Sequence, residues 1–218
     1  MSTEAPPQLG NGTKVGYAVG SLAAGAFGTV PGFLLVIYLT DTLGVAAAVA
    51  GLAVAIPKFW DVIFNPIVGG WSDRTNSKMG PRRPWMLAGA LLLPVFFIAM
   101  FSVPAGLSPA TSALLVAGAF LICASTYALF QVPYVSLPAE MTSNYRERTS
   151  VVAFRIVALT LGILLSGALA PVLVNAGGGG YTGHTLMAIV IGLFMSVAMI
   201  VAVIGTRKAP RTTVPSGE

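Results

Sequence analysis

The sequence predicts an all-α membrane protein of six transmembrane helices, with the N and C termini in the cytoplasm. Its composition is the first observation behind this prediction. Of the 218 residues, 56% are hydrophobic and only 9% are charged, whereas a soluble domain carries about 25% charged residues. A globule of this size would have too few charges to face water on all sides. The bilayer is therefore the natural solvent, and a soluble fold is excluded.

The apolar runs are the second observation. Crossing a bilayer core takes about 20 mostly apolar residues, and six runs of that length are expected near 17–39, 46–71, 85–103, 110–137, 150–174 and 184–205. They leave a polar N-terminal tail over 1–16 and a polar C-terminal tail over 206–218. The N-terminal tail lacks a basic region, a short apolar run and a small-residue cleavage site, so we expect no cleaved signal peptide.

The basic residues outside these runs gather on one side of the predicted bundle. They lie before the first run, after the sixth, and in the second and fourth connections: Lys14, Arg74, Lys78, Arg82, Arg83, Arg146, Arg148, Arg207, Lys208 and Arg211. The other three connections contain none. By the positive-inside rule, the basic loops and both termini are cytoplasmic. This topology also accounts for the net charge of +5, and no nucleic-acid partner is expected.

Polar residues inside the second helix are the first candidates for function. Lys58 and Asp61 are three residues apart, and Asp61 and Asn65 are four apart, so the three share one helix face. Asp61 lies about 15 Å from the cytoplasmic end, near the middle of the core. An isolated charge there costs at least about 2.5 kcal/mol. We interpret Asp61 as a site for a coupling cation or proton; a structural Lys58–Asp61 pair is the alternative.

Arg155, one to two turns into the fifth helix, is the third intramembrane charge. Arginine does not discharge in proteins. It therefore needs a partner, for which Asp61, Glu140, a helix C-terminus and an anionic substrate are candidates, or its head reaches the cytoplasmic interface by snorkelling. A role in substrate binding or gating and a snorkelling role both stay open.

No enzyme is expected from this sequence. It has no Gly-x-Ser-x-Gly elbow, no metal-spaced His, Cys and carboxylate cluster, and no phosphate loop. Cys123 is the single cysteine and is expected to pack in the apolar interior. Neither a cofactor nor a metal is therefore expected.

Small residues recur every four positions in the first helix, at Gly16, Gly20, Ala24, Gly28 and Gly32. Such spacing lets helices approach closely in lipid. Tight packing is the favoured interpretation, and a face that slides or lines a cavity is the alternative.

Four stretches of the sequence resemble the N-terminal half of the glycoside–pentoside–hexuronide cation symporters, the melibiose-permease-like branch of the major facilitator superfamily. They are Tyr38-Leu39-Thr40-Asp41-x-x-Gly44, Trp60-Asp61-x-x-x-Asn65-Pro66, Asp73-Arg74-Thr75-x-Ser77-x-x-Gly80-x-Arg82-Arg83-Pro84-Trp85, and Gln131-Val132-Pro133-Tyr134 through Arg146-Glu147-Arg148-Thr149 to Arg155. Order and spacing agree from about Tyr17 to Gly205. The resemblance implies half of a major facilitator fold, with two inverted three-helix repeats over 17–205.

The resemblance also implies a coupling site that is only partly kept. Two carboxylates of the second helix bind the coupling cation in that family; the first matches Asp61 and the second falls on Asn65. A hydroxyl of the fourth helix that serves the sodium site falls on Ala128. Sodium coupling is therefore not expected. Asp61 could instead carry a proton, and Lys58 would tune or replace the coupling cation.

The sugar site is likewise only partly kept. Two acidic sugar-binding positions of the family fall on Gly25 and Gln131, while its fifth-helix arginine matches Arg155. A melibiose-type substrate is not expected for this reason. The substrate contacts that we expect are Arg155, Gln131, Tyr134, Asn65 and Lys58. The loop residues Asp73, Arg74, Gly80, Arg82 and Arg83 form an expected cytoplasmic gating motif.

Together these features predict a half-size secondary transporter in the plasma (inner) membrane, acting as a homo- or heterodimer by alternating access. The expected partners are a small solute, either sugar-like or an amphiphile, membrane lipid, and a second six-helix half, either a copy of itself or a different chain. A fragment of a longer protein is a further interpretation. A non-transporting accessory or assembly protein that pairs with another half is the alternative from a different class.

Overall fold

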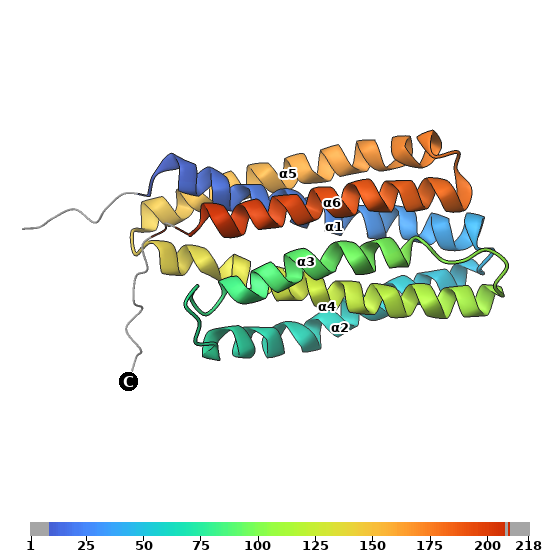
Figure 1. Cartoon of the computed structure of the whole chain (residues 1–218), viewed down its shortest axis with the longest axis horizontal. Helices are drawn as coiled ribbons and strands as arrows, with labels where there is room; N and C mark the ends of the chain where they lie inside the picture. Colours follow the sequence, from blue (N-terminus) through green and yellow to red (C-terminus); the bar gives the residue numbers. More distant parts are fainter. Residues whose placement is uncertain (1–8, 208, 210–218) are drawn as a thin grey trace, which may run out of the picture.

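The computed structural model describes residues 9–207 and 209, and it forms a bundle of long helices that run side by side along one axis (Figure 1). In chain order these are α1 (Asn11–Ile37), which continues into a π-helical turn η1 (Tyr38–Thr42), α2 (Ala47–Arg74), α3 (Arg83–Met100), α4 (Pro109–Met141), α5 (Tyr145–Ala176) and α6 (Gly180–Gly205). All six are long and apolar enough to span a membrane. The predicted fold class is therefore confirmed.

Several helices extend beyond the apolar runs that predicted them. The fourth run was expected over 110–137 and the fifth over 150–174, yet α4 reaches Met141 and α5 begins at Tyr145. Polar caps mark the starts of α4 and α5. Ser108 Oγ accepts a hydrogen bond from the Thr111 backbone N–H at the start of α4, and Asn144 Oδ1 accepts one from Arg146 at the start of α5. Each cap satisfies a backbone N–H group that has no partner within the first helical turn, which stabilises the start of the helix.

The first and fourth helices occupy equivalent positions in the bundle. Helix α1 packs on α5 and α6, whereas α4 packs on α3 and α2. Helix α3 also packs on α6. In each half of the chain, the first helix thus packs against the second and third helices of the other half.

The small-residue face of α1 packs at one end and is open at the other. A Cβ on Gly16 would lie 2.9 Å from the Gly205 Cα, and one on Gly20 would lie 2.8 Å from the Ala202 Cβ. Side-chain-free helices can therefore touch there, as the packing interpretation expects. Gly28 and Gly32, by contrast, have no neighbour within 4 Å of an added Cβ among the described residues.

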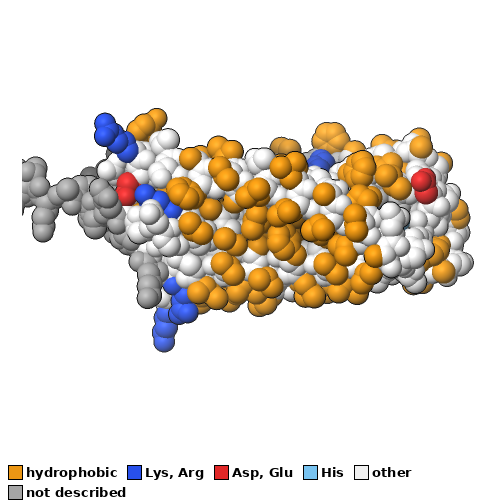
Figure 2. Space-filling view, turned by 90° about the horizontal axis from the view of Figure 1, so that it is seen from above, with side chains coloured by type: hydrophobic (Ala, Val, Ile, Leu, Met, Phe, Trp, Pro, Cys, Tyr) orange, Lys and Arg blue, Asp and Glu red, His pale blue; other side chains and the backbone are white. Residues whose placement is uncertain are grey.

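The charges confirm the predicted orientation. Helix α1 begins and α6 ends on the same side of the bundle (Figure 1). In Figure 2, Lys and Arg gather at that end, while hydrophobic side chains cover most of the length. Of the ten basic residues that carried the prediction, Lys208 and Arg211 lie outside the described residues. The basic end is the cytoplasmic end.

Candidate transport site

The polar residues of α2 share one side of the helix, as their spacing predicted. Asp61 is partly buried, whereas Lys58 and Asn65 are exposed in this six-helix bundle. No ion pair within 4.0 Å joins Lys58 to Asp61 in the part of the chain that is described. The sealed structural pair that the sequence left open is therefore not formed in this structure.

The neighbours of Asp61 come from α4. Beside it, Trp60 Nε1 donates a hydrogen bond to Ser125 Oγ at 2.8 Å, which ties α2 to α4. Tyr127, two residues after Ser125 on α4, lies within electrostatic range of both Asp61 and Arg155. Tyr127 also stacks on Phe27 of α1, with ring centroids 4.1 Å apart. Tyr127 of α4 is thus near both the acidic and the basic intramembrane groups.

A pair of tyrosines joins α1 to α4. Tyr17 and Tyr134 stack with centroids 4.5 Å apart, and neither is exposed. The Tyr134 hydroxyl donates to the Tyr17 carbonyl at 2.7 Å and shares a 2.7 Å hydrogen bond with Ser21 Oγ. The Tyr17 hydroxyl in turn donates to the Tyr134 carbonyl at 3.2 Å. These reciprocal bonds fix Tyr134 firmly in place. Sequence reasoning named Tyr134 but missed Tyr17 and Ser21.

Arg155 lies over this tyrosine pair. Its guanidinium carbon is 5.8 Å from the centroid of the Tyr134 ring, within the range of a cation–π interaction. Glu140, proposed as a partner, is instead bonded to Arg82, and no ion pair joins Arg155 to Asp61. The aromatic face is a contact that none of the sequence-based alternatives included.

Two polar atoms near the tyrosines lack partners. Arg155 Nε and Gln131 Oε1 are both buried and make no hydrogen bond to any of the described residues. Gln131 precedes Tyr134 by three residues on α4, so both lie on the same side of that helix. The first is a donor and the second an acceptor. A buried group without a partner is costly, so such a pair is an expected feature of a site that awaits a ligand.

The position Gly25, aligned with an acidic sugar-binding residue by resemblance, has no room for a side chain. An added Cβ would lie 2.7 Å from the Ile163 backbone N and 2.9 Å from the Gly162 carbonyl carbon. Helix α1 crosses α5 at this point. An acid could not occupy the position unless the two helices moved apart. Ala128, the counterpart of the family hydroxyl, is also buried.

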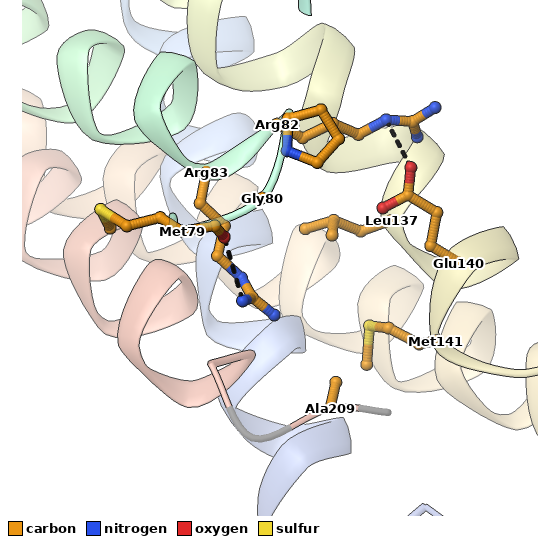
Figure 3. A pocket seen from close by; sticks show the side chains of 9 residues that line it. Met79, Gly80, Arg82, Arg83, Leu137, Glu140, Met141 and Ala209 are labelled. Atoms are coloured by element: carbon orange, nitrogen blue, oxygen red, sulfur yellow. Dashed lines mark hydrogen bonds and ion pairs between the residues drawn. The ribbon is translucent and has the colours of Figure 1, made fainter. Parts of the chain in front are cut away.

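Arg82 joins the cytoplasmic motif to the end of α4, and Figure 3 shows its guanidinium beside Glu140. Arg82 Nη2 lies 3.0 Å from Asp73 Oδ1, and Arg82 Nε lies 2.9 Å from Glu140 Oε1. The loop after α2 is thereby tied to the end of α4. Gly80 has a φ of 96°, which favours glycine because other residues rarely adopt it. Glu140 is a member of this cluster that sequence reasoning had considered only as a partner of Arg155.

Arg83 and Arg74 differ in their roles within the motif. Arg83 is buried and donates to the carbonyls of Met79 and Thr206, so it links the loop to the end of α6. Arg74 is exposed, and no hydrogen bond or ion pair is formed by its side chain within the described ranges. The structure therefore brings four of the five expected motif residues together and leaves Arg74 apart.

Glu147 is a buried acid that the sequence analysis named only as part of the family motif. It accepts hydrogen bonds from the Leu9 backbone N–H at 2.8 Å and from Thr142 Oγ1 at 3.0 Å, and it lies 3.8 Å from Lys14 Nζ. These contacts tie the beginning of α1 to the beginning of α5. Its position after the Asn144 cap looks like ordinary helix-start chemistry, so spacing alone gives no signal of this role.

Comparisons with known proteins agree with this architecture. The sequence model of the family described as MFS/sugar transport protein matches residues 16–217. An uncharacterized symporter of Synechocystis sp. is 35% identical over 162 residues, which make up 71% of this chain and 29% of that protein. The inner membrane symporter YicJ of Escherichia coli is 30% identical over 206 residues, or 92% of this chain and 44% of that protein.

A vertebrate relative has the same percentage identity to this chain as YicJ. The sphingosine-1-phosphate transporter MFSD2B of Xenopus tropicalis is 30% identical over 158 residues, or 72% of this chain and 30% of that protein. The chain spans less than half the length of each of these three relatives. The expected resemblance to half of a symporter is confirmed. Its described residues form six helices that are long and apolar enough to span a membrane, and the chain is a multi-pass plasma-membrane protein that belongs to the MFS/sugar transport protein family.

Proposed function

We propose that this chain is half of a secondary transporter, which pairs with a second six-helix half and moves a small solute by alternating access. The exposure of Lys58 and Asn65 on α2, at the depth of the hydrocarbon core, carries this proposal. An ammonium and an amide at that depth cannot face lipid tails without a large free-energy cost. A second half lying against this side of α2 would cover both groups and enclose a polar site.

The packing of the bundle supports the same proposal. The reciprocal positions of α1 and α4 fit two inverted three-helix repeats within 17–205. In transporters built from such repeats, the substrate binds near the membrane midplane, where the repeats or halves meet. Because α1 begins and α6 ends on the same side, two copies can stand side by side about a two-fold axis normal to the membrane.

Arg155, Gln131, Tyr134, Asn65 and Lys58 are the proposed substrate contacts. The unsatisfied donor on Arg155 and the unsatisfied acceptor on Gln131 fit a hydroxylated, sugar-like solute. A hydroxyl group both accepts and donates, so one hydroxyl can satisfy both atoms. Tyr134 is fully buried in this structure, so its proposed part in substrate binding is to support the Arg155 guanidinium from behind. An amphiphile is the second candidate substrate, favoured by the sphingosine-1-phosphate transporter among the relatives.

Asp61 is the proposed coupling site. Its carboxyl group is partly buried and is not held by an ion pair with Lys58. It is therefore free to gain a proton when it is accessible from one side of the membrane and to lose it on the other. Lys58 lies one turn away on the same helix face, where its positive charge would compete with a bound metal cation. This arrangement favours protons over sodium as the coupling ion.

The pairing is tested by native mass spectrometry of the chain purified in mild detergent from its own cell. A homodimer at twice 22.4 kDa, or a complex with one other membrane chain, is the expected result. A clean monomer that transports solute after reconstitution would contradict the proposal.

Cysteine cross-linking in membranes identifies the face that pairs. In a Cys123→Ala background, Asn65→Cys should form a cross-link to the second half. Ile63→Cys is the matched control, because it is 61% exposed and lies two residues away on nearly the opposite side of α2. Equal cross-linking from both positions would show random collision and not a defined interface.

An accessory or assembly role is the candidate from a different class. It is favoured by Gly25, where no acid fits, and by the loss of the family carboxylate at Asn65. If this role is correct, replacing Asp61 and Arg155 together leaves the function of the assembled complex unchanged. Loss of solute uptake in the double variant, with normal assembly, would exclude it.

A further inference from the structure

A shallow hollow at the cytoplasmic end of the bundle has no role in the proposed transport site. It measures about 430 Å³ and is lined by Trp71, Arg74, Thr75 and Trp85, where α2 ends and α3 begins. The two indole rings stack with centroids 5.9 Å apart. Trp85 Nε1 donates to Thr75 Oγ1 at 2.8 Å, and Thr75 Oγ1 donates to the Trp71 carbonyl at 2.7 Å. Hydrogen bonds within the lining therefore hold Trp85 and Thr75 in position.

The hollow contains a cation without a counter-charge. Arg74 is exposed, and its guanidinium makes no hydrogen bond or ion pair within the described residues. The neighbouring acid, Asp73, is engaged by Arg82 at 3.0 Å. Trp71 is 49% exposed, and its indole N–H likewise has no partner in the described structure. The N–H donors of Arg74 and Trp71 are therefore both without a partner among the described residues on one small surface.

An apolar strip leads from this hollow toward the middle of the membrane. Ile67 and Ile63, 40% and 61% exposed, precede Trp71 by four and eight residues on α2, so they lie on the same side of the helix. Leu92, 43% exposed, lies two turns beyond Trp85 on α3. Helices α2 and α3 each pack on α4 but share no extensive contact with one another. The strip therefore borders a shallow trough between two helices.

The hollow faces away from the proposed interface with the second half. Trp71 lies six residues after Asn65, which corresponds to about 120° around α2. The polar groups that need covering by a second half are thus on one side of the helix, and the hollow is on another. In the proposed assembly, the side of the hollow is therefore left open to lipid.

We propose that this hollow binds the headgroup of an anionic phospholipid from the cytoplasmic leaflet. A guanidinium group pairs with a phosphate through two parallel hydrogen bonds. Tryptophan is enriched at the depth of the headgroups, and the cytoplasmic leaflet is the one that carries anionic lipid. The strip of Ile67, Ile63 and Leu92 would receive an acyl chain. A soluble anion would use Arg74 but would have no use for the strip.

Lipid selectivity can be measured by fluorescence quenching in reconstituted bilayers. The chain has three tryptophans, so a Trp60→Phe background confines the signal to Trp71 and Trp85. Brominated phosphatidylglycerol is compared with brominated phosphatidylcholine at equal mole fractions. Both lipids carry a phosphate, but Arg74 repels the choline ammonium of phosphatidylcholine, so phosphatidylglycerol is expected to bind about tenfold more tightly. The variant Arg74→Gln should abolish this preference, whereas Arg148→Gln, an exposed arginine at the same end on α5, should keep it.

Three outcomes would overturn the assignment. Equal quenching by the two lipids in the parent protein would show no selectivity at the hollow. An equal loss of preference in Arg74→Gln and Arg148→Gln would show only the summed charge of the cytoplasmic end. Displacement of phosphatidylglycerol by millimolar inorganic phosphate or glycerol phosphate would identify a site for soluble anions. None of these results depends on whether the chain transports a solute.

Discussion

Gly25 of α1 and Gly162 of α5 meet where the two helices cross, and neither position has space for a side chain. A Cβ on Gly25 would lie 2.9 Å from the Gly162 carbonyl carbon, and a Cβ on Gly162 would lie 2.8 Å from the Leu22 Cα. Both contacts are with backbone, which cannot rotate away as a side chain can. The crossing therefore brings Arg155, seven residues before Gly162 on α5, near the Tyr17–Tyr134 pair of α1 and α4.

This crossing should be sensitive to a single methyl group. Gly162→Ala is expected to destabilise the bundle by about 1 to 3 kcal/mol, because the added Cβ forces α1 and α5 apart. Gly118→Ala on α4 is the matched control, since nothing lies within 4 Å of its added Cβ. Thermal unfolding in detergent, followed by size-exclusion chromatography, compares the two. Equal melting temperatures would show that α1 and α5 can move apart at this crossing without loss of stability.

The Tyr134 hydroxyl is expected to contribute to stability as well as to the site. Tyr134→Phe removes its bonds to the Tyr17 carbonyl and to Ser21 Oγ, both of which are buried. A loss of about 1 to 3 kcal/mol follows when buried partners are left unsatisfied. Tyr145→Phe is the control, because Tyr145 is 81% exposed. Chemical unfolding curves that coincide for the two variants would contradict the reciprocal bonding of α1 and α4.

Asp61 is expected to be indispensable for coupled uptake. Asp61→Asn keeps the size and the hydrogen-bonding capacity of the side chain but cannot release a proton. Uptake driven by a proton gradient into vesicles should fall to background while membrane expression is unchanged. Asp41→Asn, an exposed acid in the η1 turn, should keep normal uptake. Proton-driven uptake by Asp61→Asn at the normal rate would remove Asp61 from the coupling mechanism.

Arg82 is expected to hold the loop between α2 and α3. Arg82→Gln breaks its ion pairs to Asp73 and Glu140, the second of which is 29% exposed. An ion pair of this kind contributes at most about 1 kcal/mol, which corresponds to roughly fivefold faster hydrogen exchange in the loop. The Gly80 amide, bonded to the Ser77 carbonyl, lies in the affected peptide. Lys78→Gln, an exposed lysine of the same loop, should leave the exchange rate unchanged, and equal rates in the two variants would refute this role.

The sequence could predict little of how the candidate site is assembled, although it named most of the residues. Spacing put Lys58, Asp61 and Asn65 on one side of α2, and the structure agrees. Spacing could not show that Arg155 would lie over Tyr134, because that contact joins α5 to α4 across the bundle. The same holds for Glu140, whose pairing with Arg82 depends on the end of α4 lying beside the loop after α2.

The number and orientation of the spanning helices were determined by the sequence itself, because hydrocarbon thickness and the cost of moving basic residues across it act on composition alone. Which residues contact one another across the bundle was decided only by the tertiary structure. Gly25 shows the difference. Its place in the chain suggested a lost acidic contact, yet the crossing of α1 and α5 leaves no room for any side chain. Close approach of two backbones is a property of the packed helices, and no local pattern in either helix specifies which glycine will meet which.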